Sequence, residues 1–133
     1  MKEGTIDNIM WMKEVFGTDK PVIGVLHMHA MPTDPKYDPV TGIEGVIEAA
    51  RKDLRAYQEG GIDGILFCNE FSIPYTPNVR TVTVATMARV IGELKSEIKV
   101  PFGVTVAADA MKCYDLAAAV GASFIRSVLH GAA

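Results

Sequence analysis

The stretch that decides the fold is Val22-Ile-Gly-Val-Leu-His-Met-His-Ala-Met-Pro32. Its first half is a short run of bulky apolar residues that begins after Pro21, and such a run predicts a strand buried on both faces, as in a parallel sheet. His27 and His29 follow at its carboxyl end, and a strand's period of two points both side chains to the same side. Ligands of parallel α/β folds bind beyond the carboxyl ends of the strands. The stretch therefore predicts a strand that ends in a site.

Composition sets the broad class of the protein. The 133 residues are 49% hydrophobic and 22% charged, which fits one domain over residues 1–133 with a buried core. A net charge of −3 argues against nucleic acid, which calls for a basic patch. No apolar run is long enough for a membrane span, and the acidic first residues lack the apolar core of a signal peptide.

The two cysteines, Cys68 and Cys113, are too few and too far apart for a metal motif. We interpret them as reduced thiols, one on a strand and one on a helix. Reduced thiols indicate a cytoplasmic protein.

Apolar runs alternate with amphipathic segments along the whole chain. Predicted strands cover residues 21–28, 64–68, 102–108 and 123–129, and predicted helices cover 1–18, 43–59, 81–98 and 110–120. Alternation of this kind predicts βαβ units with right-handed crossovers. We expect an α/β fold with four parallel strands in the order 1-2-3-4, three crossover helices on one face and an N-terminal helix.

A set of short motifs spread from about residue 20 to the end resembles the BtpA/SgcQ family. Each motif alone is weak, since Gly-Gly-x-Asp-Gly before a strand occurs in many barrels, but their order and spacing carry the resemblance. They are Val22-Ile-Gly-Val-Leu-His27, Pro32, Gly60-Gly61-Ile-Asp63-Gly64, Phe67-Cys-Asn-Glu70, Pro74-Tyr75, Gly103-Val-Thr-Val, Asp109 and Gly121-Ala-Ser-Phe-Ile-Arg126.

The resemblance implies a TIM (β/α)8 barrel, of which this chain would be the N-terminal half. A family member is expected to be roughly twice as long, and the loops after strands seven and eight, which often hold phosphate, would be absent here. We therefore expect the chain to be truncated relative to the family and inactive alone. An uncovered half-barrel is expected either to self-associate or to need its missing C-terminal half.

Polar residues gather at the predicted strand ends and are the candidate site. His27, Glu70 and Asp109 are the candidate catalytic residues, because imidazole and carboxylate groups act as general acids and bases. The candidate ligand-binding residues are His29, Asn69, Arg126 and His130. Arginine is suited to clamp a phosphate or carboxylate.

Each candidate also has a structural alternative. The histidines could be hydrogen-bonded structural groups, and Asn69 or Glu70 could cap the following loop. Asp109 could be the N-cap of the helix over 110–120. Arg126, placed within the fourth predicted strand, could form an interior ion pair with Glu70 or Asp109.

A divalent metal is a further expectation for His27 and His29, because His-x-His on a strand supplies permitted ligands. The sequence contains no P-loop, dinucleotide-binding glycine motif or nucleophile elbow.

Two functions stay open at this level. The first is an enzyme of the lyase, isomerase or hydrolase type, acting on a small phosphorylated or carboxylated metabolite such as a sugar phosphate by acid–base or metal-assisted chemistry. The second, which the resemblance implies, is a non-catalytic assembly factor of the photosystem I biogenesis kind that uses the barrel as a scaffold. The fold alone does not choose between them.

Overall fold

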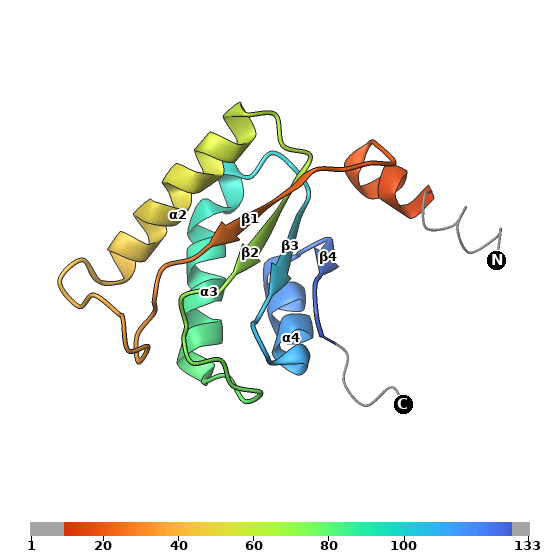
Figure 1. The fold of residues 1–133 in the computed structure, drawn as a ribbon. Coiled ribbons are helices and arrows are strands. Elements are labelled where there is room, and N and C mark those ends of the chain that lie inside the picture. Colours follow the sequence, from red (N-terminus) through yellow and green to blue (C-terminus); the bar gives the residue numbers. More distant parts are fainter. Residues whose placement is uncertain (1–9, 129–133) are drawn as a thin grey trace, which may run out of the picture.

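The structure is a computed structural model that describes residues 10–128. Its sheet has four parallel strands in the order β1-β2-β3-β4, as predicted. The strands are β1 (Ile23–His27), β2 (Gly64–Cys68), β3 (Phe102–Thr105) and β4 (Phe124–Ile125). The chain thus forms an open, half-barrel-like α/β unit (Figure 1).

Three helices connect the strands and lie on one side of the sheet (Figure 1). They are α2 (Gly42–Glu59), α3 (Thr81–Leu94), which continues into the 3-10 turn η1 (Lys95–Glu97), and α4 (Ala110–Val120). Residues 10–16 are also helical, within the region where an N-terminal helix is predicted. The left-handed backbone of Gly121, with φ 73°, ends α4 as a C-cap.

Several predicted elements are longer than the observed ones, and the first strand, predicted over residues 21–28, covers Ile23–His27. The third strand ends at Thr105 instead of residue 108, because the chain turns there: Ala108 has φ 69°, and the N–H of Asp109 donates to the carbonyl of Val106. The fourth strand stops at Ile125, and its predicted last residue lies outside the described part of the chain. The helix predicted to residue 98 ends at Leu94.

Alternate side chains of the strands form the core between the sheet and its helices. Leu26 from β1, Met28 directly after it, Phe67 from β2 and Val104 from β3 are almost completely buried in this layer. The helices contribute apolar side chains at helical spacing, among them Ile47, Ala50 and Leu54 of α2 and Met87, Val90 and Ile91 of α3.

The opposite side of the sheet, which no helix of the α2–α4 layer covers, is here called the open face. On β1 it carries Ile23, Val25 and His27, and these side chains are more exposed than their neighbours Gly24 and Leu26. The register places Leu66 beside Val25 and Cys68 beside His27, so these β2 side chains also belong to the open face.

Aromatic rings cover the amino end of the open face. Phe16 lies over Gly64 and Phe124 over Gly103, because a Cβ on either glycine would come within 2.7 Å or 2.4 Å of the ring. The two rings pack edge to face at 5.3 Å, and Trp11 packs on Phe16 at 6.1 Å. The helix before β1 therefore covers this end of the sheet, and the glycines make room for it.

The free edge of β1 is partly protected by α2. The N–H of Met28 donates to Cys68 and the carbonyl of Val22 accepts from Asp63, so the even-numbered residues of β1 bond to β2. The carbonyl of Val25 consequently points to the free edge, where it accepts the hydroxyl of Tyr57 at 2.9 Å.

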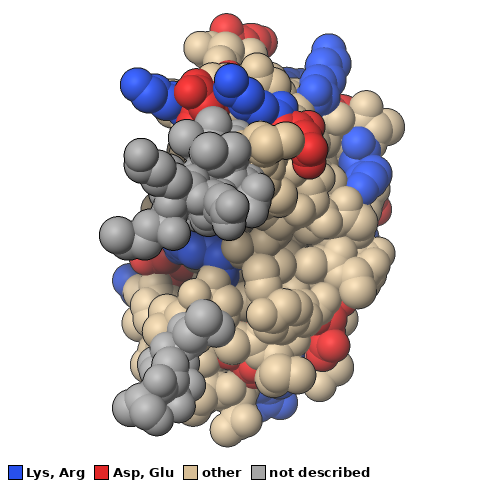
Figure 2. Space-filling model, turned by 90° about the vertical axis from the view of Figure 1, so that its right-hand side faces the viewer, with Lys and Arg blue, Asp and Glu red and all other residues tan. Residues whose placement is uncertain are grey.

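Seen from the side opposite α2, the molecule presents a broad area without charged residues, and Lys, Arg, Asp and Glu lie mainly toward its rims (Figure 2). Half-exposed apolar and aromatic side chains such as Trp11, Ile23, Phe71 and Tyr75 contribute to the apolar surface of the protein. Among the described helices, none has the length and apolar character needed to cross a membrane.

Candidate functional site

Four side chains form a row across the carboxyl end of the open face: His27, Cys68, Thr105 and Arg126. The register pairs His27 with Cys68 and Cys68 with Thr105. The N–H of Arg126 donates to the carbonyl of Val104 at 3.2 Å, which extends the β3–β4 ladder by one residue. Residues paired across a sheet share a face. With strands spaced by about 4.8 Å, this carboxyl-end row spans roughly 14 Å, a length suited to a small metabolite.

Glu70 is held beside the centre of the carboxyl-end row. The thiol of Cys68 donates to Oε2 of Glu70 at 3.5 Å, and the Tyr75 hydroxyl donates to the Glu70 carbonyl at 2.8 Å. Burial, followed by the hydrogen bond and negative charge of Glu70, raises the pKa of the Cys68 thiol to about 12, while the positive charge of Arg126 opposes this rise. Cys68 is therefore a neutral donor that orients the carboxylate and is no nucleophile at neutral pH.

The two histidines predicted to share a side lie against the same ring. The rings of His27 and His29 both meet Phe71 edge to face, with centroid distances of 6.3 Å and 5.9 Å. Both side chains are exposed. His29 also lines a cavity of about 270 Å³ beside the β1–α2 loop, together with Lys36 and Thr41.

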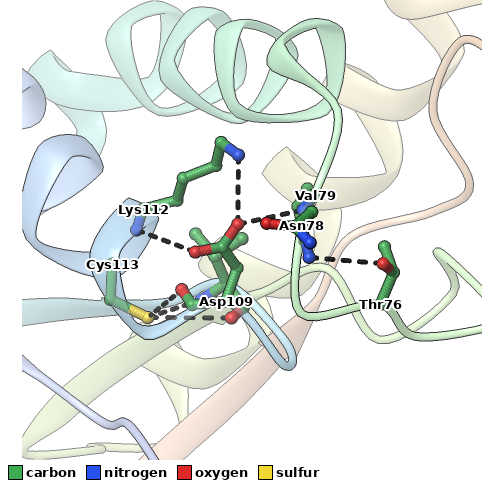
Figure 3. Close-up of polar contacts among 7 residues, drawn as sticks. Thr76, Asn78, Val79, Asp109, Lys112 and Cys113 are labelled. Atoms are coloured by element: carbon green, nitrogen blue, oxygen red, sulfur yellow. Dashed lines mark hydrogen bonds and ion pairs between the residues drawn. The ribbon is translucent and has the colours of Figure 1, made fainter.

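Asp109 occupies the N-cap position of α4, the structural alternative predicted for it (Figure 3). Its Oδ1 accepts the N–H of Lys112 at 3.3 Å, and its Oδ2 accepts the N–H of Val79 at 2.9 Å and the ammonium group of Lys112 at 3.0 Å. Burial is the largest influence on the pKa of Asp109 and raises it, but the bonds and charge of Lys112 and the Val79 N–H together hold it below its usual value. These bonds account for Asp109 without a catalytic role, and that role stays a prediction.

Asn69 is a structural link in this structure. It is buried, and its Oδ1 accepts the N–H of Ala107 at 2.6 Å, which connects the ends of β2 and β3. Its expected part in ligand binding stays a prediction. His130, the remaining candidate, lies outside the described residues.

Arg126 was expected to lie within a strand and need an interior partner, and this placement is wrong. It follows β4 directly and its side chain is exposed. Among residues 10–128 it takes part in no ion pair, so the expected pairing with Glu70 or Asp109 is not formed there. Its guanidinium group is available to a ligand.

The expected divalent metal is not tested by this geometry. Within the described part of the chain, no three His, Cys, Asp or Glu side chains come together in a group that could hold a metal ion. Metal binding by His27 and His29 stays a prediction.

Sequence reasoning missed Cys68, Thr105 and Tyr75 as members of the site. The signal that could have found Cys68 is the strand period of two, because Cys68 precedes Glu70 by two residues and is therefore expected to share its side. Thr105 becomes visible only through the register of β3 with β2. Tyr75 comes from a loop whose path no periodicity predicts.

Comparisons with known proteins place the chain in a family. The family model described as BtpA family matches residues 18–133. The sgc region protein SgcQ of Escherichia coli is 51% identical over 122 residues, which cover 92% of this chain and 46% of SgcQ. An uncharacterised protein of Pyrococcus furiosus is 36% identical over 92% of this chain and 47% of its own length.

A further relative is the photosystem I biogenesis protein BtpA of Synechocystis, 35% identical over 89% of this chain and 42% of its own length. No solved structure matches the chain. The chain spans slightly less than half the length of these curated relatives. Because the family model covers most of the sequence, the chain belongs to the BtpA family.

Proposed function

We propose that this chain supplies the N-terminal half of a barrel enzyme that acts on a small phosphorylated or carboxylated metabolite by acid–base chemistry. The observation that carries the proposal is the carboxyl-end row, in which four parallel strands each contribute one side chain to the same end of the open face. Active sites of (β/α)8 barrels lie at this end of the strands.

In the proposed reaction, Glu70 takes or gives the proton. Its carboxylate is held by the Cys68 thiol from one side, and the Tyr75 hydroxyl fixes its backbone carbonyl. Burial, together with Glu70, raises the pKa of Tyr75, so its phenol stays protonated at neutral pH and remains a donor. A general base works best when its geometry is fixed before the substrate binds.

His27 and Arg126 have complementary roles at the two ends of the carboxyl-end row. The exposed imidazole of His27 lies on the strand next to Cys68 and supplies a second group that can give or take a proton. The guanidinium of Arg126, which forms no ion pair within residues 10–128, binds the anionic group of the substrate at the other end. A substrate that bridges the row would place its reacting carbon near Glu70. If a divalent metal binds at His27 and His29, the same site would support metal-assisted chemistry.

The experiment uses a chimera in which residues 18–133 replace the matching segment of Escherichia coli SgcQ, which completes the barrel. The chimera is incubated with a panel of sugar phosphates and small carboxylic acids, and product formation is followed by mass spectrometry. We expect Glu70→Gln to lower turnover by about a hundredfold or more, and His27→Ala to lower it while sparing the fold.

The matched control is Glu59→Gln, which changes an exposed glutamate at the last turn of α2. It is expected to keep full turnover. Unchanged turnover in both Glu70→Gln and His27→Ala would reject the proposal, provided that thermal unfolding shows all variants to be folded. A large loss of melting temperature in His27→Ala would instead support a structural role for that histidine.

A non-catalytic assembly factor is the second candidate function. The observation that favours it is the 35% identity to a relative named as a photosystem I biogenesis protein, together with the broad uncharged surface of this chain (Figure 2). Exposed apolar side chains such as Trp11, Ile23 and Phe71 add to this argument, because large exposed apolar patches mark interaction sites. A chimera that converts no compound of the panel, but forms a stable protein complex whose stability is independent of those compounds, would favour this candidate.

A further inference from the structure

We propose that a cavity between the β3–α4 loop and the chain after β4 binds the phosphoryl group of the substrate. The cavity measures about 370 Å³ and is lined by Tyr75, Thr105, Ala108, Arg126 and Ser127, with Asp109 and Ala110 at the start of α4. The inference rests on the proposed function and narrows its substrate class from phosphorylated or carboxylated to phosphorylated.

Arg126 provides the charge that recognises the anion. It lines the cavity, its side chain is exposed, and within residues 10–128 no carboxylate pairs with it. A guanidinium group presents two parallel N–H donors that match two oxygens of a phosphate. An arginine that no protein carboxylate neutralises retains its full charge for a ligand.

Ser127 and the loop before α4 provide further donors. The Oγ of Ser127 is buried and has no hydrogen-bond partner among the described residues, and Ser127 lines the cavity. Ala108 and Ala110 line the same cavity, and no backbone hydrogen bond from their N–H groups is formed within the described residues. A buried hydroxyl without a partner is unfavourable, and a phosphate oxygen would satisfy it.

The carboxylate of Asp109 does not repel the anion, because its charge is already compensated. Both of its oxygens accept hydrogen bonds, and the ammonium group of Lys112 lies 3.0 Å from Oδ2 (Figure 3). The same bonds hold the β3–α4 loop in the conformation that gives Ala108 its positive φ of 69°. Asp109 is therefore a positioning residue for the cavity.

The number of donors favours phosphate over carboxylate. Arg126, Ser127 and two backbone N–H groups surround one cavity, and these donors exceed what the two oxygens of a carboxylate can use. A phosphoryl group has three oxygens free to accept, and the start of a helix adds a favourable dipole. The cavity also lies directly beside Thr105, a member of the carboxyl-end row, so a phosphoryl group bound there leaves the rest of the substrate next to Glu70.

The test is a titration of the 133-residue chain with inorganic phosphate, followed by the amide signals in ¹⁵N NMR spectra. We expect saturable shifts at residues 105–111 and 126–128. Arg126→Gln should weaken phosphate binding by about tenfold or more, and Arg126→Lys, which keeps the charge but loses the two-pronged geometry, should weaken it less. Ser127→Ala should weaken it as well, and acetate should bind more weakly than phosphate.

Arg80→Gln is the matched control, because Arg80 is also exposed and stands at the start of α3, at the same end of the sheet. It is expected to leave phosphate affinity unchanged. The proposal is overturned if the shifts do not saturate, if they lie elsewhere in the chain, if Arg80→Gln weakens binding as much as Arg126→Gln, or if acetate binds equally well.

The outcomes separate this inference from the proposed function. Phosphate binding in the cavity, combined with normal turnover of the Glu70→Gln chimera, would refute the proposed acid–base role and leave the phosphate site standing. An active chimera that depends on Glu70, combined with no phosphate shifts in the chain, would refute only the phosphate site.

Discussion

The thiol of Cys68 donates to the carboxylate of Glu70 across 3.5 Å, and this pair lies at the middle of the carboxyl end of the sheet. The thiol is buried and the carboxylate is partly exposed. The donor therefore lies in the sheet, where it cannot move, and the acceptor faces the side from which a substrate would approach. The pair therefore combines a buried donor, the thiol, with an accessible carboxylate.

The first prediction concerns the ionisation of Cys68. Glu70→Gln should lower the pKa of the Cys68 thiol from about 12, because the negative charge that disfavours the thiolate is removed and one carboxylate oxygen is replaced by a donor. The pKa should stay above its ordinary value, since burial is the largest cause of the shift. The rate of alkylation of the peptide that contains Cys68, measured by mass spectrometry as a function of pH, reports the change. An unchanged midpoint would show that the contact with Glu70 has no electrostatic effect.

The second prediction concerns the cap of α4. Asp109→Ala should lower the free energy of unfolding by about 2–4 kcal/mol, because it removes the N-cap and leaves the buried N–H of Val79 without an acceptor. The pKa of Asp109 is lowered in the folded state, so its stabilising contribution is complete at neutral pH and is lost as the pH falls below the ordinary aspartate value.

Chemical denaturation at neutral and acidic pH tests this prediction. Asp115→Ala on the exposed side of the same helix is the control and should change stability little. An Asp109→Ala variant with parental stability and an unchanged acid transition would contradict the assignment of the cap.

The third prediction compares two glycines. A Cβ on Gly24 would lie 2.6 Å from the ring of Tyr57, so Gly24→Ala should cost about 1–3 kcal/mol of stability. A Cβ on Gly92 in α3 meets nothing within 4 Å, so Gly92→Ala should stabilise the protein by about 0.5–1 kcal/mol. Thermal unfolding of both variants gives the comparison. Equal effects would mean that Tyr57 does not pack closely against β1.

The fourth prediction concerns association. The open face carries half-exposed apolar side chains, and both edge strands of the sheet lack a partner within the described residues. We expect the isolated chain to self-associate, or to bind a C-terminal half taken from one of its longer relatives, through an apolar interface of roughly 2,000 Å² or more. Sedimentation at micromolar concentration tests this. A well-folded monomer that does not bind an added C-terminal half would contradict this prediction.

The elements best predicted from sequence are those whose ends are marked by glycine or proline. Helix α4 has the predicted bounds, because Asp109 begins it and Gly121 ends it, and β2 also agrees with its prediction. The end of α3 was not predictable, because Lys95-Ser-Glu97 is compatible with helix. The three residues form a 3-10 turn, and Glu97 in this turn forms ion pairs with Arg51 and Arg55 of α2. Only the tertiary structure reveals these contacts.

The candidate site remains a prediction, but its place at the strand ends agrees with the geometry of the sheet. His27, Glu70 and Arg126 were selected because they stand at strand ends, and the structure brings their strand ends to one end of the sheet. Thr105 was missed because its place beside Cys68 depends on the register between strands, which no local pattern encodes. The second hydrogen-bond partner of Asp109 was not predictable, because Val79, whose N–H it accepts, lies thirty residues away in the sequence.

The hydroxyl of Tyr57 on the outer carbonyl of Val25 has a consequence for how a barrel could be completed. A strand that docks along the free edge of β1 meets the carbonyl of Val25, which already accepts the hydroxyl of Tyr57. An N–H of the incoming strand therefore has to share this carbonyl or displace the phenol. Backbone pairing at this rung is then an exchange of one hydrogen bond for another, with little net gain. The favourable energy of docking has to come from apolar side chains. Registers in which no N–H of the incoming strand lies opposite the carbonyl of Val25 are preferred. Tyr57 would in this way help to select the register of an incoming strand.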